Sequence, residues 1–351
     1  MAPEAPATAI LFMIAHFTVA KKPCPGNNGG VNFESSSRAS SYASDEQSLA
    51  RPDIAIAHRS ALRSIQRVVE ETAMATDPEV ARDGIGQMLD AGGVLVLTGA
   101  GVSTGSGIPD YRGPQGSLKK HRPMTYQEFR YDDGARQRYW ARSYVGWRRM
   151  RRAEPNAAHY LLAKFEECGA LAGLVTQNVD GLHMRAGSQN VVAIHGDLDR
   201  VICLMCGHLE ARGHMDLRMA EVNPGYLERL ESEELQVNPD GDVELDDSFI
   251  RDFQMVGCEV CGSTRLKPDV VYFGESVPAE RKAAVAQMER DAASLLIVGS
   301  SVAVMSGFKL ALNAQKAGKP IGVINGGPGR ADTRATYLWR TEVAAALAQL
   351  V

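Results

Sequence analysis

Four of the six cysteines stand in two short pairs that could hold a metal ion. Cys203 and Cys206 form one C-x-x-C pair, Cys258 and Cys261 form the other, and a glycine follows each pair. This pattern is typical of turns that carry thiolates to a tetrahedral zinc ion. The 51 residues between the pairs exceed the usual spacing, so we expect an insertion there. Four cysteine ligands leave no open coordination position, which predicts one structural zinc; a redox role is the alternative.

A glycine-rich stretch could bind a diphosphate. The apolar run 94–97 is typical of a buried parallel strand, and Gly99, Ala100 and Gly101 follow it. These small residues allow a sharp turn that brings backbone N–H groups against phosphate oxygens. A dehydrogenase fingerprint requires a third glycine where Thr104 stands, and a later acidic residue at a strand end. The stretch therefore predicts a dinucleotide held outside the usual hydride-transfer arrangement.

Polar residues that could perform catalysis follow two further apolar runs. His195 ends one run, and an imidazole can act as a base near neutral pH. His183 is the alternative base. Asn178 and Asp180 follow another run, and both side chains project the same way if the chain is extended. An Asx turn is the alternative for these two residues.

These residues need alternating strands and helices to bring them together. The hydrophobic pattern predicts strands at 94–98, 171–176, 191–194, 270–273, 294–298 and 320–324. It predicts helices at 78–91, 155–168, 278–290, about 305–317 and at the C-terminus, with loops and small helices over 108–152. The expected fold is α/β, a Rossmann-like doubly wound parallel sheet, with a small zinc-binding module inserted at about 200–266. Five loops should meet at the carboxyl ends of the strands: 99–112, 177–183, 195–196, 299–301 and 325–327.

Composition and charge narrow the class of protein. The 351 residues carry a net charge of −4, which predicts no direct nucleic-acid partner. No apolar run approaches the ~18 residues of a membrane span, so no membrane partner is expected. The segment 112–152 carries twelve Lys/Arg against three Asp/Glu, and 207–257 carries thirteen Asp/Glu against four Arg. We expect solvated surface for both, or a basic border to an anion site as the alternative.

The N-terminal residues differ in character from the rest. Residues 1–75 are rich in Ser, Asn, Gly and Ala and lack a periodic pattern, so we expect an extension that is poorly ordered and lies outside the fold. Met74 is a candidate start just before the first strong helix. The catalytic domain is then expected to be 76–351. Cys24 and Cys168 are expected to have no role in the metal site.

The motifs taken together resemble the sirtuin family of NAD-dependent protein-lysine deacylases. The resemblance rests on G-A-G-V-S-T-x-S-G-I-P-D-Y-R from Gly99, T-Q-N-V-D-G-L-H from Thr176, His195-Gly196 and the cysteine pairs. It continues through K-P-D-V-V-Y-F-G-E from Lys267, G-S-S from Gly299 and I-N-G-G from Ile324, so that it covers about 78–330 in family order. The segment 138–142 and the long acidic insertion resemble the class II branch.

The resemblance implies a reaction and roles for residues. NAD would be a co-substrate, and the acyl oxygen of an acyl-lysine would attack its ribose and expel nicotinamide, with His195 as base. The partners would be acyl-lysine proteins or peptides, bound as a strand between 273–275 and the chain after Ser301. Asn178 and Asp180 would also serve catalysis. The implied cofactor-binding residues are Gly99, Ala100, Gly101, Ser103, Gly107, Asp110, Tyr111, Arg112, Gln177, Asn178, Val179, Asp180, Gly299, Ser300, Ser301, Asn325, Gly326 and Gly327.

Several departures leave alternatives open. The segment 337–340 does not resemble the usual family ending, which affects the adenine side. Tyr139 and Arg142 form a Y-x-x-R pair like that of desuccinylating sirtuins, but plain helix-surface residues are favoured because the offset from 155–159 is about one helical turn too long. Other possible functions are mono-ADP-ribosyl transfer to protein and a non-catalytic NAD-sensing scaffold. The expected location is cytoplasmic, or mitochondrial in a eukaryote.

Overall fold

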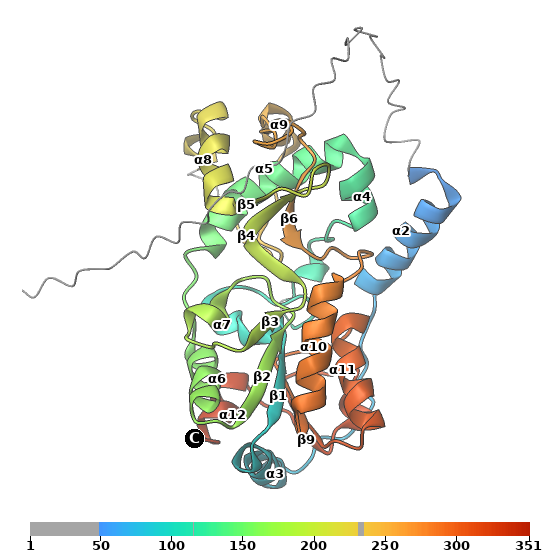
Figure 1. Ribbon diagram of the computed structural model, residues 1–351, viewed down its shortest axis with the longest axis vertical. Helices are drawn as coiled ribbons and strands as arrows, with labels where there is room; N and C mark the ends of the chain where they lie inside the picture. The colour runs from blue at the N-terminus through green and yellow to red at the C-terminus, as the bar shows by residue number, and fades with distance from the viewer. Residues whose placement is uncertain (1–48, 115, 231–234) are drawn as a thin grey trace, which may run out of the picture. The chain divides into compact units, whose positions relative to one another are not determined.

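A six-stranded parallel sheet forms the centre of the fold (Figure 1). The computed structural model describes residues 49–114, 116–230 and 235–351. The strand order is β3-β2-β1-β7-β8-β9. The strands are β1 (Val94–Thr98), β2 (Leu171–Thr176), β3 (Val191–Ala193), β7 (Ser294–Val298), β8 (Ile321–Ile324) and β9 (Tyr337–Trp339).

Helices cover both faces of this sheet because its strands are apolar on both faces. Alternate residues of β1 and β7 separate into two hydrophobic clusters. Leu95 and Leu97 pack with α10 (Ala279–Asp291) and α11 (Met305–Lys316). Val94 and Val96 pack with α3 (Pro78–Ala91), α6 (Ala157–Glu167) and α12 (Val343–Ala348) on the other face. The predicted doubly wound α/β fold is therefore confirmed.

The strand order reverses direction at β1, and this places the site. From β1 the chain moves through β2 to β3 on one side, and later from β7 through β8 to β9 on the other. A crevice opens at the carboxyl ends of strands at such a switch point. The loop after β1, with Gly99 and Gly101, and the loop after β7, with Gly299, meet there. We call them the two glycine-containing loops. The short helix α7 (Leu182–Arg185) follows the loop after β2.

A smaller module contains the cysteine pairs. Its antiparallel sheet has the order β5-β4-β6, with β4 (Gly196–Cys203), β5 (Leu209–Ala211) and β6 (Leu266–Val270). A third cluster joins this sheet to the helices around it, including the buried Trp140, Tyr226 and Phe253. These helices are α4 (Tyr126–Tyr131), α5 (Asp133–Met150), α8 (Arg212–Val222) and α9 (Asp247–Asp252).

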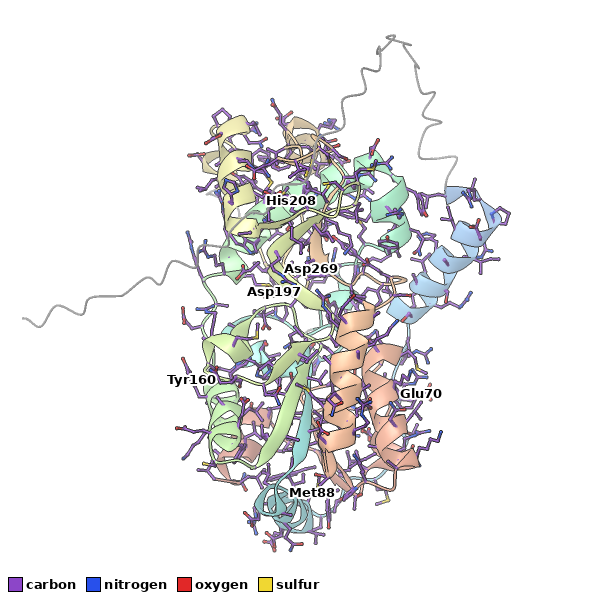
Figure 2. The ribbon with its side chains drawn as sticks, in the orientation of Figure 1. Glu70, Met88, Tyr160, Asp197, His208 and Asp269 are labelled. Atoms are coloured by element: carbon purple, nitrogen blue, oxygen red, sulfur yellow. The ribbon has the colours of Figure 1, made fainter. Side chains whose placement is uncertain are left out.

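One ion-paired position ties the module to the main sheet. Asp197 on β4 lies opposite Asp269 on β6 (Figure 2). Arg281 of α10 contacts the Asp269 carboxylate at 2.7 Å, although α10 covers the large sheet. Because β4 begins directly after His195, this contact fixes the start of β4 and the position of His195 next to it.

Three element predictions are corrected. The strand expected at 270–273 is wrong: β6 ends at Val270 and belongs to the small sheet. The chain turns toward the crevice there, where the Val271 N–H donates to the His195 carbonyl (2.7 Å). The region 108–152 was expected to hold only loops and small helices but contains the 18-residue α5. The sequence prediction also missed β9, whose Leu338 and Trp339 are buried.

Part of the expected N-terminal extension is structured. Helix α2 (Pro52–Ile65) buries Ile54, Ala61 and Ile65, and its His58 Nδ1 lies 3.0 Å from Thr125 Oγ1. Residues 49–75 therefore contact the domain, unlike the expectation for them; residues 1–48, including Cys24, lie outside the described residues. In the part of the chain that the structure describes, no helix has the length and apolar character needed to cross a bilayer.

Candidate active site

A large cavity lies at the carboxyl ends of β1, β2 and β7. Its volume is about 1430 Å³, whereas a site for one small molecule typically has about 300–1,000 Å³. The cavity can therefore hold two ligands together. Of the predicted cofactor-binding residues, all but Gly107 are among the described residues of its wall, and so is His195. Gly107 instead ends a 3₁₀ turn with φ +81°, where a glycine is favoured.

The two glycine-containing loops pack backbone against backbone. The Gly101 N–H donates to the Gly299 carbonyl at 2.9 Å. A Cβ on Gly101 would lie 2.7 Å from that carbonyl oxygen, and one on Gly99 would lie 2.6 Å from Ser300 Oγ. Gly299 also has a left-handed φ of +58°. Only glycine allows this close approach of the two loops at the cavity wall.

Asn178 and Asp180 belong to one hydrogen-bond network centred on Ser103. The buried Ser103 hydroxyl donates to Asp180 Oδ2 at 2.7 Å and accepts from Asn178 Nδ2 at 3.0 Å. Asn178 Nδ2 also donates to the Gly99 carbonyl (3.1 Å), which links the network to the loop after β1. Asp180 Oδ1 accepts from the Leu182 N–H at 2.9 Å, so the alternative Asx turn is present at this residue. Burial raises the pKa of Asp180.

His195 presents one basic nitrogen to the cavity wall. Its Nδ1 lies 2.9 Å from the Gln177 carbonyl, which can only accept, so Nδ1 carries the proton. Nε2 then holds a lone pair and accepts from the Ser306 hydroxyl at 2.7 Å. Burial lowers the pKa of His195 to about 4, which keeps the imidazole neutral at physiological pH. This is the protonation state that a general base needs.

The alternative base, His183, has a structural environment. Its Nε2 lies 2.9 Å from Thr98 Oγ1, and its ring packs on His159 with centroids 4.8 Å apart. The residue is 1% exposed, and burial lowers its pKa to about 3. Among the described residues that form the cavity wall, His195 is present and His183 is not. His183 therefore supports the end of the sheet.

The opposite side of the cavity is set by Gln177, Ser300 and Asn325. Gln177 Nε2 donates to Ser300 Oγ at 2.7 Å and to the Thr98 carbonyl at 3.1 Å. Gly307 makes room for this side chain, since a Cβ there would lie 2.5 Å from Gln177 Oε1. Asn325 Nδ2 donates to the Gly327 carbonyl at 2.7 Å and shapes its own loop. The three loops after β2, β7 and β8 thus form one continuous wall.

The loop that carries Asp110, Tyr111 and Arg112 contacts α2. Arg112 donates to the carbonyls of Ser64, Ile65 and Arg67, each at 3.4 Å. Residues 64–69 also line the cavity. The sequence analysis missed this contribution because the segment lacks a recognisable motif. It also missed Ser306, since a single serine at a helix start carries little signal.

The Y-x-x-R pair does not act as a unit. Tyr139 lines the cavity, but Arg142 does not appear among the described residues of the wall. Arg142 contacts Asp242 at 3.0 Å and Glu244 at 2.7 Å. Its charge is therefore already paired. Tyr139 and Arg142 are both buried, so the expectation that they are plain helix-surface residues is wrong.

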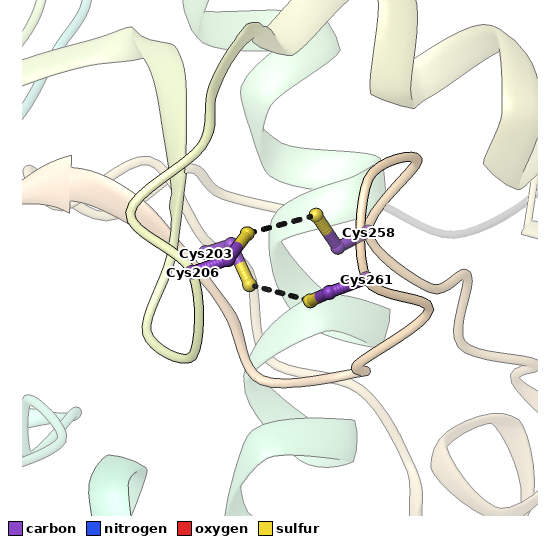
Figure 3. Close-up of side chains that lie close together, drawn as sticks. All are labelled: Cys203, Cys206, Cys258 and Cys261. Atoms are coloured by element: carbon purple, nitrogen blue, oxygen red, sulfur yellow. Dashed lines mark hydrogen bonds between the residues drawn. The ribbon is translucent and has the colours of Figure 1, made fainter. Parts of the chain in front are cut away.

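The four paired cysteines form a cluster that fits one zinc ion (Figure 3). Cys203 ends β4 and Cys206 lies in the turn after it, whereas Cys258 and Cys261 lie in the loop before β6; none is in a disulfide. Cys203 Sγ lies 3.6 Å from Cys261 Sγ, and Cys206 Sγ lies 3.7 Å from Cys258 Sγ. Zinc–sulfur bonds of about 2.3 Å at tetrahedral angles place sulfurs about 3.8 Å apart. The spacing therefore fits a closed, structural site. Cys168 is exposed and outside the cluster.

Comparisons with known proteins agree with this geometry. The Sir2 family model matches residues 99–306. The "NAD-dependent protein deacetylase 1" of Corynebacterium efficiens is 58% identical over 271 residues, which are 77% of this chain and 96% of that protein. The human "NAD-dependent protein lipoamidase sirtuin-4, mitochondrial" is 44% identical over 68% of this chain and 76% of that protein. A solved structure of Sir2 with a p53 peptide and NAD+ has a TM-score of 0.58 and 27% identity, over 76% of this chain and 95% of that chain.

Proposed function

Because the chain belongs to the Sir2 family, it is an NAD-dependent protein deacylase, and we propose that His195 is its catalytic base. The observation that supports this role is the orientation of the His195 imidazole ring. The Gln177 carbonyl holds the proton on Nδ1, so Nε2 is the nitrogen that can accept a proton at the cavity wall. When Nε2 gains a proton, the same carbonyl stabilises the imidazolium through the Nδ1–H bond.

We propose that the two glycine-containing loops hold the diphosphate of NAD, and that Asn178 and Asp180 hold its ribose and nicotinamide. NAD supplies an electrophilic ribose carbon with nicotinamide as the leaving group. The fixed network of Ser103, Asn178 and Asp180 supports this role, because hydrogen bonds within the network lock both side chains before substrate binds. Ser300, Ser301 and Asn325 would hold the adenosine half on the opposite wall. Holding both substrates in attack geometry is expected to supply much of the rate enhancement.

We propose that the acyl-lysine of a protein substrate enters between the segment 273–275 and the chain after Ser301, since both line the cavity. The Phe273 carbonyl already accepts from the Tyr126 N–H at 2.9 Å, so a substrate strand would pair with other groups of this segment. The preferred acyl group follows from the charge near Tyr139: Arg142 is not among the described residues of the cavity wall and is engaged with two carboxylates. We therefore expect acetyl or other uncharged acyl groups to be preferred over succinyl.

We also propose that residues 76–351 form the catalytic domain, against which α2 packs and to whose cavity wall residues 64–69 contribute, and that the protein works in the cytoplasm. None of the cysteines among the described residues forms a disulfide, which suits a reducing compartment.

The test is His195→Tyr compared with His214→Tyr, which changes an exposed histidine of α8. Loss of a general base typically lowers the rate by about 10²–10⁴-fold. We expect at least a hundredfold loss of nicotinamide release from NAD and acetyl-lysine peptide in His195→Tyr, with zinc content and melting temperature unchanged. His214→Tyr should keep wild-type activity. Equal activity of the two variants would contradict the assignment of the base, and label transfer from NAD to protein would favour ADP-ribosyl transfer.

A further inference from the structure

A second group of side chains that could coordinate a metal ion lies in the cavity wall, apart from the cysteine cluster. His121, Asp240 and Asp242 all line the cavity, and their ligand atoms lie within 4.8 Å of one another. The His121 side chain is 5% exposed and that of Asp242 is 6% exposed. Among the described residues, the buried His121 Nε2 and Asp240 Oδ1 have no hydrogen-bond partner. An orphaned ring nitrogen in such a place requires an explanation.

The distances are too long for hydrogen bonds but suit a shared ion. His121 Nε2 lies 3.8 Å from Asp242 Oδ1 and 3.9 Å from Asp240 Oδ2. Hydrogen bonds of this type are about 2.7–3.2 Å long. Two ligands that each lie about 2.1 Å from a metal ion at a tetrahedral angle are about 3.4 Å apart. A closure of about half an ångström, within the reach of small side-chain rotations, would complete the site.

The surrounding groups orient the histidine as a metal ligand requires. His121 Nδ1 contacts the Glu244 carboxylate and also lies 3.0 Å from an Arg142 Nη atom. Metal-bound histidines commonly donate their other N–H to a carboxylate. Arg142 forms ion pairs with Asp242 and Glu244 and holds both carboxylates in place. Three carboxylates, those of Asp240, Asp242 and Glu244, surround one guanidinium and one imidazole.

We propose that His121, Asp240 and Asp242 bind one divalent cation of the Mn²⁺ or Zn²⁺ type in the cavity wall, in addition to the zinc of the cysteine cluster. One imidazole and two carboxylates suit such ions. The inference does not depend on the proposed catalytic roles, because cation binding can be measured without NAD or peptide.

The position of the site suggests what the ion would do. The backbone N–H of His121 donates to the Ser117 carbonyl (2.8 Å), and the backbone N–H of Ser117 donates to the Asp110 carbonyl (2.9 Å). Two backbone hydrogen bonds thus connect His121 to the loop that carries Asp110, Tyr111 and Arg112. An ion that joins His121 to Asp240 and Asp242 would brace this loop against the zinc module.

The experiment measures metal content and Mn²⁺ binding on the full chain. Mass spectrometry first counts the resident ions per chain, and electron paramagnetic resonance then follows free Mn²⁺ during titration. Asp240→Asn removes a ligand that is 26% exposed and is not among the carboxylates that contact Arg142, so the fold should tolerate it. The matched control is Asp246→Asn, an exposed carboxylate of the same acidic segment.

We expect the wild-type chain and Asp246→Asn to hold one divalent ion beyond the structural zinc. Asp240→Asn should hold only the zinc, or bind Mn²⁺ at least ~10-fold more weakly. A wild-type chain that saturates at the zinc alone would overturn the proposal and leave His121 as an imidazolium paired with the two aspartates. Equal Mn²⁺ affinity in Asp240→Asn and the wild type would also overturn it.

Discussion

At the scale of single residues, His195 shows how a backbone group selects a catalytic nitrogen. The Gln177 carbonyl accepts from Nδ1–H, and the Ser306 hydroxyl reaches Nε2 at 2.7 Å. Substrate must displace Ser306 from Nε2 before that nitrogen can accept a proton. Ser306 is therefore a positioning residue that stabilises the neutral ring in the free enzyme.

We expect Ser306→Ala to move the acid limb of the pH profile to higher pH. The serine hydroxyl donates to neutral His195, which lowers the pKa of the ring further than burial alone, so its removal raises that pKa. A hydrogen bond contributes about 0.5–1.5 kcal/mol, and one pKa unit corresponds to about 1.4 kcal/mol. The limb in kcat/KM should therefore shift upward by about half to one pH unit, while activity well above pH 7 changes little. Ser301→Ala, in the neighbouring loop, should leave this limb in place.

The candidate site could be predicted from sequence where residues occur in dense, ordered motifs. The cysteine pairs, the glycine-containing loops and His195 all lie where the motifs place them. Ser306 and His121 could not be found in this way, because their roles depend on partners 111 and more than 100 residues away in the chain. The choice between His195 and His183 also needed the structure, since both follow strand ends.

At the scale of elements, β9 and α3 depend on each other. The Tyr337 ring of β9 lies over Gly84 of α3, and a Cβ on Gly84 would meet ring atoms at 2.3–2.6 Å. Gly86, on the same helix, has only the Leu350 side chain nearby at 3.8 Å. The two helical glycines therefore differ in packing alone.

We expect Gly84→Ala to lower the free energy of unfolding by about 1–3 kcal/mol, because the stiff Tyr337 ring must move and disturb β9. Gly86→Ala should raise it by about 0.5–1 kcal/mol through helix propensity. Urea denaturation of both variants checks the pair. Equal effects of the two substitutions would show that Tyr337 does not hold β9 on α3.

Elements were predictable where apolar periodicity was clear. The ranges of α3, β1, β2 and β7 match the prediction residue for residue. Helix α5 was missed because it is buried nearly all round, including Arg136 and Arg142, and so it shows no apolar stripe. Strand β9 was missed because three residues are too short to display a period.

At the scale of the whole molecule, ion pairs join the basic segment 112–152 to the acidic segment 207–257. Arg148 of α5 binds Asp216 of α8 at 2.7 Å, and Arg142 binds Asp242 and Glu244. Solvated surface was expected for both segments, but these ion-paired residues lie between elements of the module. Arg142 and Arg148 join the basic segment to the acidic one inside the zinc module.

The hydrophobic interior is also divided. Cys203 and Cys258 belong to the cluster that joins α5 to the small sheet, whereas α3, α6, α10, α11 and α12 pack with the main sheet in two others. Trp140 and Trp147 lie in α5, and Trp339 lies in β9. With Trp339→Phe as background, tryptophan fluorescence reports on α5 of the module, while far-UV circular dichroism reports on the helices of both the module and the main sheet.

We expect Cys258→Ser to lose zinc and to separate the two unfolding transitions. Three remaining ligands cannot close the tetrahedral site, and structural zinc contributes directly to folding free energy. The fluorescence midpoint should then fall below the circular dichroism midpoint by ten degrees or so, in line with a loss of a few kcal/mol. Tyr139 and Tyr272 connect the module to the cavity, so NAD binding should weaken as well.

Cys168→Ser, which changes an exposed cysteine outside the cluster, is the matched control and should retain zinc and a single transition. Coincident midpoints in a zinc-free Cys258→Ser chain would show that the module folds only as one unit with the main sheet.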